Sequence, residues 1–331
     1  ANFLNNLGNI ASTRGDIDEA EKLHKRSLEI KVEIGDREGE CTSLANLGIV
    51  AGVRGVFTDD FTEALRYYSE ALKIARETGN RRYESMVLNN IGDIEINEGR
   101  YAEAERLIKQ SITIRKDIGD RIGEAISLNG LGQIKLKMEN FADAKIHFNN
   151  CLSISREVGN WEGEKAALGN LGSIALQQEE LDEAKHFFNE CLEICLKVGD
   201  LFSSVGVFYS LSEVATKQSN YNEAERLLRD GLESARKGNN LEAIAAMLDS
   251  LADVLNTQGN ITEAETLYRE MVSILEGAGY RSDLPEILEK LAIIAQARND
   301  PNEQRRLNTE AVKIWRELGQ PIGQWYIDNG Y

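Results

Sequence analysis

The chain repeats one short pattern about every forty residues along almost all of its 331 residues. An apolar residue followed by a small one occurs at Leu7-Gly8, Leu47-Gly48, Ile91-Gly92, Leu131-Gly132, Leu171-Gly172, Leu211-Ser212, Leu251-Ala252 and Leu291-Ala292. A second motif, in which an apolar or aromatic residue precedes an acidic residue and then Ala, follows each of the first seven pairs. Periods of this length indicate a solenoid, in which each unit buries its apolar side by stacking on its neighbours.

One repeat can be interpreted as a pair of helices joined by a short turn. Gly119 is expected to end one helix, and Asp120 to cap the next. Apolar residues at helical spacing then predict a first helix from about Arg121 to Lys137 and a second from about Phe141 to Val158. The second repeat carries four extra residues between Val53 and Asp60, which we expect in the turn of that repeat.

The composition excludes several classes of function. A net charge of −17 would repel a phosphate backbone, so nucleic-acid binding is not expected. No apolar run is expected to reach the length that spans a membrane, and no signal peptide is visible. Cys151 and Cys191 stand where other repeats have Ser or Ala, so the four cysteines are interpreted as small packing residues of a protein in the reducing cytoplasm.

The repeated motifs resemble tetratricopeptide repeats, with the Gly-Asp or Gly-Asn spacing seen in spindle-orientation adaptors, kinesin light chains and the sensor arrays of signal-transduction ATPases. The resemblance covers the whole chain and implies an all-α fold, a right-handed superhelical solenoid of eight helix pairs followed by a C-terminal capping helix at 321–331. The array would comprise residues 1–320, with repeats at about 1–36, 37–80, 81–120, 121–160, 161–200, 201–240, 241–280 and 281–320.

The two ends of the array differ in the sequence. Asp328 and Tyr331 stand where earlier repeats have packing leucines, so the last segment is expected to tolerate solvent. The first helix begins late in the repeat and has no comparable cap. We therefore expect the chain to be a fragment of a longer protein.

In tetratricopeptide arrays the side of the first helix that faces away from the packing stripe lines an inner groove. Amides recur on that side in the first five repeats, where they could bind the backbone of an extended peptide. The predicted peptide-binding residues there are Asn5, Asn6, Asn9, Asn46, Asn89, Asn90, Asp93, Asn129, Gln133 and Asn170. The alternative is that these residues only solvate an exposed helix surface.

The later repeats place acidic and aromatic residues on the same side. The predicted binding residues there are Tyr209, Glu213, Asp249 and Asp253, and only Lys217 and Lys290 offset their charge. Such a surface favours a ligand with basic residues.

Nothing in the sequence predicts an enzyme. Only three histidines occur, and His24 stands where other repeats have Tyr68 or Phe148, which indicates a core residue. No nucleophile elbow, phosphate loop or metal-ligand spacing is present, so neither cofactor nor metal is expected.

The sequence therefore predicts a non-enzymatic scaffold that binds a protein or peptide in its concave groove. Two alternatives stay open. The chain could be the ligand-sensing C-terminal arm of a larger signal-transduction ATPase, or it could be a structural array that self-assembles end to end.

Overall fold

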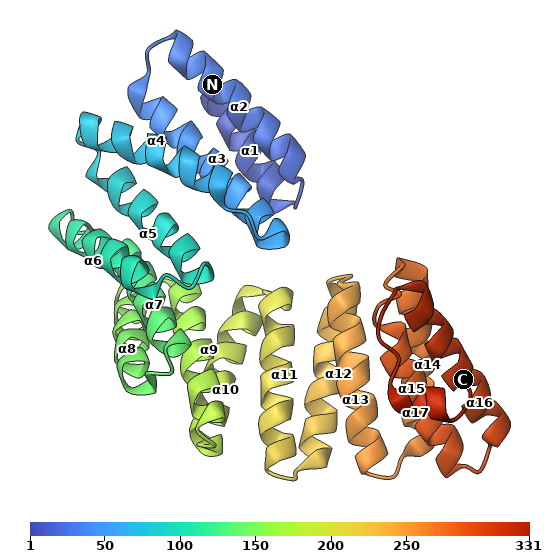
Figure 1. Cartoon of the computed structure of the whole chain (residues 1–331). Coiled ribbons are helices and arrows are strands. Elements are labelled where there is room, and N and C mark those ends of the chain that lie inside the picture. Colours follow the sequence, from blue (N-terminus) through green and yellow to red (C-terminus); the bar gives the residue numbers. More distant parts are fainter. The chain divides into compact units, whose positions relative to one another are not determined.

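The structure, a computed structural model, describes residues 1–331 and consists of seventeen α-helices without a β-strand (Figure 1). The helices are α1 (Asn2–Thr13), α2 (Ile17–Glu33), α3 (Arg37–Thr58), α4 (Thr62–Thr78), α5 (Arg81–Asn97), α6 (Tyr101–Asp117), α7 (Arg121–Lys137), α8 (Phe141–Val158), α9 (Trp161–Gln177), α10 (Leu181–Val198), α11 (Leu201–Lys217), α12 (Tyr221–Lys237), α13 (Leu241–Thr257), α14 (Ile261–Ala278), α15 (Leu284–Ala297), α16 (Pro301–Glu317) and α17 (Gln324–Asp328). The predicted all-α stack of helix pairs with a short C-terminal helix is confirmed.

The chain divides into two compact units, Ala1–Ile174 and Ala175–Tyr331. Within each unit, consecutive helices pack into pairs, and each pair packs on the next. We call the first helix of each pair helix A and the second helix B. Helix A is therefore α1, α3, α5, α7 and α9, and then α11, α13 and α15.

The boundary between two repeats shows why the helices start and stop where they do. Asp120 caps α7, because its carboxylate accepts a hydrogen bond from the backbone N–H of Gly123 at 3.0 Å. Gly119, with φ of +69°, ends α6 in the left-handed conformation that glycine adopts without strain. The predicted limits of both helices in this repeat, α7 and α8, agree with the structure.

In three of the pairs, the glycine of helix A packs against a ring of helix B. In α7, a Cβ added to Gly132 would lie 2.5 Å from Cε1 of Phe148 in α8. Phe148 is fully buried. The same contact joins Gly48 to Tyr68 and Gly8 to His24. The repeated glycine therefore allows close helix packing, and His24 is a core residue as predicted.

The insertion in the second repeat does not lengthen the turn, as the sequence suggested, but extends the helix. α3 continues to Thr58, and Asp59 then takes a left-handed conformation with φ of 56°. By length and composition, α3 is the one helix that could cross a membrane, which the sequence analysis did not predict. Half of its apolar stretch is buried inside the structure, so packing against neighbouring helices accounts for much of its composition.

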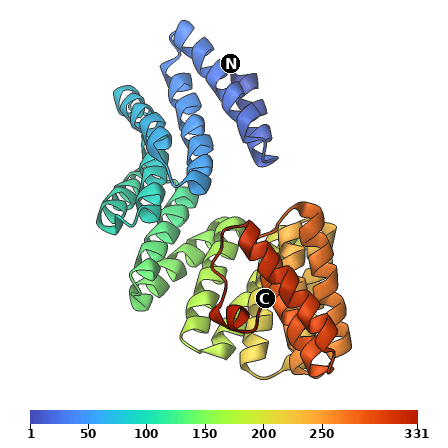
Figure 2. The ribbon, with the colours of Figure 1, turned by 45° about the vertical axis from the view of Figure 1, so that its right-hand side comes forward.

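The C-terminal segment folds back onto the last pair, α15 and α16 (Figure 2). Tyr326 of α17 is buried, packs edge to face on Trp315 at 5.3 Å, and donates a hydrogen bond to Glu289 of α15. Trp325 beside it is 52% exposed, and its ring packs on those of Tyr326 and Tyr331 at centroid distances of 4.9 and 5.9 Å.

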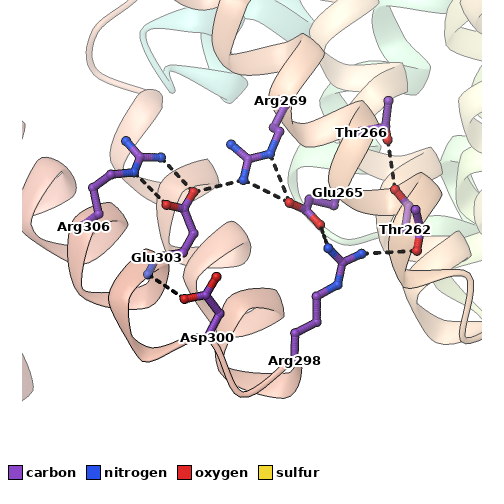
Figure 3. Close-up of polar contacts among 8 residues, drawn as sticks. All are labelled: Thr262, Glu265, Thr266, Arg269, Arg298, Asp300, Glu303 and Arg306. Carbon is purple, nitrogen blue, oxygen red and sulfur yellow. Dashed lines mark hydrogen bonds and ion pairs between the residues drawn. The ribbon is translucent and has the colours of Figure 1, made fainter.

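Ion pairs join successive B helices of the second unit along their outer surface (Figure 3). Arg269 of α14 contacts Glu265 on its own helix at 2.9 Å and Glu303 of α16 at 3.0 Å. Arg306 and Arg269 hold the pKa of Glu303 at about 2. The same step of 34 residues joins Arg229 to Glu263, so the contact recurs from repeat to repeat.

Candidate functional site

The predicted binding residues all lie on A helices. On α7, Gln133 and Ile126 are exposed and Asn129 is half-buried, whereas the packing residues Leu131 and Gly132 are buried. We call the side of the A helices that carries Ile126, Asn129 and Gln133, and their equivalents in other repeats, the groove surface.

Asn5 and Asn89 do not reach the groove surface with a free amide. Asn5 is 6% exposed, and its Oδ1 lies 2.7 Å from Nδ1 of His24. Asn89 is 3% exposed, donates to Asp93 at 3.0 Å and accepts a hydrogen bond from Ser127 at 2.8 Å. This position of helix A faces the neighbouring helices, so both amides stabilise the fold. The prediction that Asn5 and Asn89 bind a ligand is therefore corrected, and both are packing residues.

Replacing Asn89 with Ala is expected to lower the free energy of unfolding by about 1–3 kcal/mol, because Ser127 and Asp93 would lose a buried partner. Urea denaturation followed by circular dichroism would measure the change. Asn6→Ala is the control, because Asn6 is exposed and should change stability by less than about 0.5 kcal/mol. Equal stability of the two variants would contradict the packing role of Asn89.

Other predicted amides bond to one another between repeats. Asn46 of α3 donates to Asn9 of α1 at 3.1 Å, and Asn170 of α9 donates to Asn129 of α7 at 3.0 Å. Each bond uses only part of what an amide can donate and accept. These four side chains are exposed or half-buried, so they can still bind a ligand while they hold neighbouring helices in register.

Two of the acidic residues on the groove surface are paired with a lysine of the chain itself. Lys290 of α15 contacts Asp249 at 2.6 Å and Asp253 at 3.0 Å, both in α13. Its ammonium also lies 5.6 Å from the ring centroid of Tyr268, whose hydroxyl donates to Asp253. Lys290 of the chain itself thus occupies the site that was predicted for basic ligand residues at Asp249 and Asp253. Glu213 of α11, one repeat earlier, is exposed.

A pocket of about 390 Å³ opens on the groove surface of the first unit, between α3 and α5. The predicted residues Asn90 and Asp93 line it, together with Ile49, Gly52, Val53, Val56, Phe61, Tyr68, Ile94 and Asn97. Burial raises the pKa of Asp93 to about 6, against smaller opposing effects of Arg115 and Asn89. One wall is therefore apolar, and the other carries a carboxyl and two amides.

A larger pocket of about 630 Å³ lies on the groove surface of the second unit, between α11 and α13. The predicted residue Tyr209 lines it, but most of its other walls were missed in the sequence. They include Leu201, Phe202, Ser203, Val205, Gly206, Ser234, Ala235, Gly238, Asn240, Glu242, Ala243, Ala246 and Met247.

Small residues line this second pocket at positions where some other repeats have large ones. Ala235 of α12 stands where α6, three repeats earlier, has Arg115, and Gly206 of α11 stands where α7, two repeats earlier, has Ile126. Arg115 is buried and donates to the carbonyl of Gly123. The signal in the sequence was the run of small residues at Ala243, Ala245 and Ala246.

Solved structures with the same fold are similar to this chain only at low sequence identity. A signal-transduction ATPase with numerous domains from Pyrococcus horikoshii, which has a tetratricopeptide repeat sensor, matches with a TM-score of 0.74 at 18% identity. That match covers 96% of this chain and 48% of the ATPase, so this chain spans about half the length of that protein.

Two further structures match along most of their own length. A Rap protein complexed with competence and sporulation factor matches with a TM-score of 0.57 at 13% identity, covering 96% of this chain and 98% of that one. The repeats of a putative kinesin light chain from Podosopora anserina match with a TM-score of 0.51 at 17% identity, covering 60% and 97%. At such identities, these likenesses show the fold alone.

Curated protein sequences give no match to the chain. A family model described as tetratricopeptide repeat matches residues 1–54, 57–117 and 123–197, which is more than half of the chain, and a second model of the same description matches 244–277. The chain therefore belongs to the tetratricopeptide repeat family, whose fold is generally a scaffold for protein interactions.

Proposed function

We propose that the chain binds an extended segment of a partner protein along its groove surface, with an apolar side chain of that segment in the pocket between α11 and α13. The observation that carries this proposal is the pocket itself, which opens on the side of the A helices that the sequence pattern assigned to ligand binding.

The size and walls of the pocket suit one or two large apolar side chains. Its volume of about 630 Å³ falls within the range of ordinary ligand sites, about 300–1,000 Å³. Phe202 is 78% exposed and Tyr209 is 43% exposed, although aromatic rings of this size usually gain free energy by burial. A partner side chain between the two rings would cover both.

Polar groups around this pocket would orient the partner backbone. Asn240 and Ser203 line the pocket beside Glu242, and they offer both donors and acceptors. In the first unit, the amides of Asn129 and Asn170 offer the same chemistry. The likeness to a Rap protein that was solved with competence and sporulation factor supports ligand binding by this fold.

Filling the pocket tests the proposal. A Cβ at Gly206 would meet no atom within 4 Å, so Gly206→Leu should enter the pocket without displacing the helices. Peptides selected from a random dodecapeptide library on the wild-type chain would be titrated calorimetrically against the variant. We expect the affinity to fall by roughly tenfold or more, since burial of one large apolar side chain contributes about 1.5–3 kcal/mol.

The matched control is Gly277→Leu on α14, a helix B that does not carry the groove surface. A Cβ there also meets no atom within 4 Å, and Gly277 is not among the residues of the pocket. The control should keep the wild-type affinity. Equal affinity of the selected peptides for wild type and Gly206→Leu, or failure of the library to yield any binder, would reject the proposal.

A second candidate is the sensor arm of a signal-transduction ATPase. The likeness to the Pyrococcus horikoshii protein, at a TM-score of 0.74, favours this candidate. The encoding gene decides it: a phosphate-binding loop of the Walker type upstream of residue 1 would support the sensor, and an upstream region of further repeats would count against it. The buried free thiols of Cys41 and Cys151 favour a reducing compartment for either function.

A further inference from the structure

Two repeats of this chain carry the same carboxylate in different surroundings. Asp93 of α5 and Asp253 of α13 stand at equivalent positions, 160 residues or four repeats apart. Asp253 has an ammonium partner, because Nζ of Lys290 lies 3.0 Å from its Oδ2. At the position equivalent to Lys290 in the earlier repeat, α7 has Gly130, which has no side chain to offer.

Asp93 consequently lacks a close cation. Its Oδ2 accepts a hydrogen bond from Asn89 at 3.0 Å. The nearest charged influence is Arg115 of α6, but that guanidinium donates to the backbone carbonyl of Gly123 and acts on Asp93 only over a longer distance. A buried carboxylate without a counter-ion is unfavourable, and it gains from any cation that can approach it.

The groups around Asp93 include no other acid or base that would compete for a ligand cation. From α4, the phenol of Tyr68 approaches it, and burial keeps the pKa of that phenol well above its ordinary value. From α3, the pocket residues are Ile49, Gly52, Val53 and Val56, and from α7 the neighbour is Gly130. Asp93 and Arg115 are thus the charged groups at this point.

The pocket in front of Asp93 has the size and the lining residues that a long basic side chain needs. Its volume is about 390 Å³. Ile49, Val53 and Val56 form an apolar wall along which methylene groups can pack, and Asn90 and Asn97 stand beside the carboxylate. Lysine side chains bury their methylene stem in this manner while the ammonium reaches a polar group.

We infer that the pocket between α3 and α5 binds the side chain of a lysine from a partner segment, with its ammonium against Asp93 and its methylene stem along Ile49 and Val53. The inference rests on the proposed function, because it names one kind of side chain that the groove surface takes. Within the chain, Lys290 already shows an ammonium held by the carboxylate at the equivalent position.

Lysine fits this pocket better than arginine does. Arginine binds carboxylates most strongly when two parallel N–H groups meet both oxygens. Oδ2 of Asp93 already accepts a hydrogen bond from Asn89, so a bidentate arginine would have to share that oxygen, whereas an ammonium can bind the other oxygen alone.

A pair of matched probes tests the inference. Nα-acetyl-lysine N-methylamide and its norleucine analogue, which has the same stem without the ammonium, would be titrated into the full chain at pH 7.5. Methyl signals of Ile49, Val53 and Val56 would report binding by NMR. We expect the lysine probe to bind roughly tenfold more tightly, as a charge-assisted hydrogen bond provides. Equal affinity of the two probes would overturn the inference.

Two variants of the chain give the decisive controls. Asp93→Asn should abolish the preference for lysine. Gly130→Lys should supply the missing internal ammonium and weaken the lysine probe by a similar factor, whereas Gly130→Met should not; a Cβ at this site lies 3.1 Å from the flexible end of Ile108. Retained lysine preference in Asp93→Asn would refute the site.

The pH dependence and the second pocket separate this inference from the proposed function. Lowering the pH from 7.5 to 5 should weaken the lysine probe, because Asp93 takes up a proton near pH 6, and should leave the norleucine probe unchanged. Gly206→Leu should not alter either probe, since the two pockets share no residue. The lysine site can therefore fail while the larger pocket succeeds, and the reverse also holds.

Discussion

Replacing Phe148 with Ala is expected to lower the free energy of unfolding by about 3–5 kcal/mol, the usual result of truncating a buried aromatic ring. Phe148 is fully buried in α8 and lies against Gly132 of α7. Gly132 has no side chain that could fill the space left by the ring, so a cavity remains between α7 and α8. Urea denaturation followed by circular dichroism would measure the loss, and a change below about 1 kcal/mol would contradict this account of the packing.

The close contact between Phe148 and Gly132 makes the same position testable by a double-mutant cycle. Gly132→Ala alone should destabilise the chain, because its new methyl group would lie 2.5 Å from the ring of Phe148. In the Phe148→Ala background the methyl group has room, and alanine favours a helix over glycine by about 1 kcal/mol. The substitution should therefore stabilise that background. Additive effects of the two changes would show that the ring and the glycine do not define the spacing of the pair.

Replacing Asp93 with Asn is expected to raise the free energy of unfolding at pH 7.5 by up to about 3 kcal/mol. Burial raises the pKa of Asp93 from its ordinary value of 3.8 to about 6. One pKa unit corresponds to about 1.4 kcal/mol of difference between the two protonation states. The charged carboxylate therefore destabilises the fold, and an amide of the same shape avoids that cost.

The sign of the effect depends on pH in a defined way. Because the folded state holds the proton more tightly than the unfolded state, wild-type stability falls as the pH rises from about 4 to about 6. The advantage of Asp93→Asn should be absent at pH 3.5 and complete above pH 6.5. Urea denaturation of both proteins at several pH values would measure it, and a variant that is less stable than wild type at pH 7.5 would contradict the prediction.

A variant that is more stable but no longer prefers the lysine probe would link the two results. Loss of binding could then not be attributed to unfolding. It would also indicate that Asp93 is retained at a cost to stability, as is common for residues of binding sites.

The helices could be predicted from the sequence because their signals are local and repeated. Asp120 and Gly119 fix the ends of α6 and α7, and the same residue types recur at each step of forty residues. The end of α3 was predicted wrongly, because the extra residues before Asp59 contain no proline and can continue a helix as readily as a turn. Residue counting alone could not distinguish the two outcomes.

The binding surface was only partly predictable. Helical spacing placed Asp93 and Tyr209 on one side of their helices, and both line pockets there, while their role in binding stays a prediction. The spacing did not reveal that Asn89 turns toward Ser127, since a rotation of a few tens of degrees separates a buried position from an exposed one. The larger pocket was missed because Gly206 and Ala246 create it by their small size, whereas sequence motifs are defined by the side chains that are present.

The pairing of Lys290 with Asp253 in one repeat, and the glycine opposite Asp93 in another, has an evolutionary consequence. Repeats that arise by duplication begin with the same residues. Replacement of the glycine by lysine can then change a carboxylate that is open to a partner's amine into one that is paired within the chain. An array built in this manner can redistribute recognition among its copies without altering its architecture.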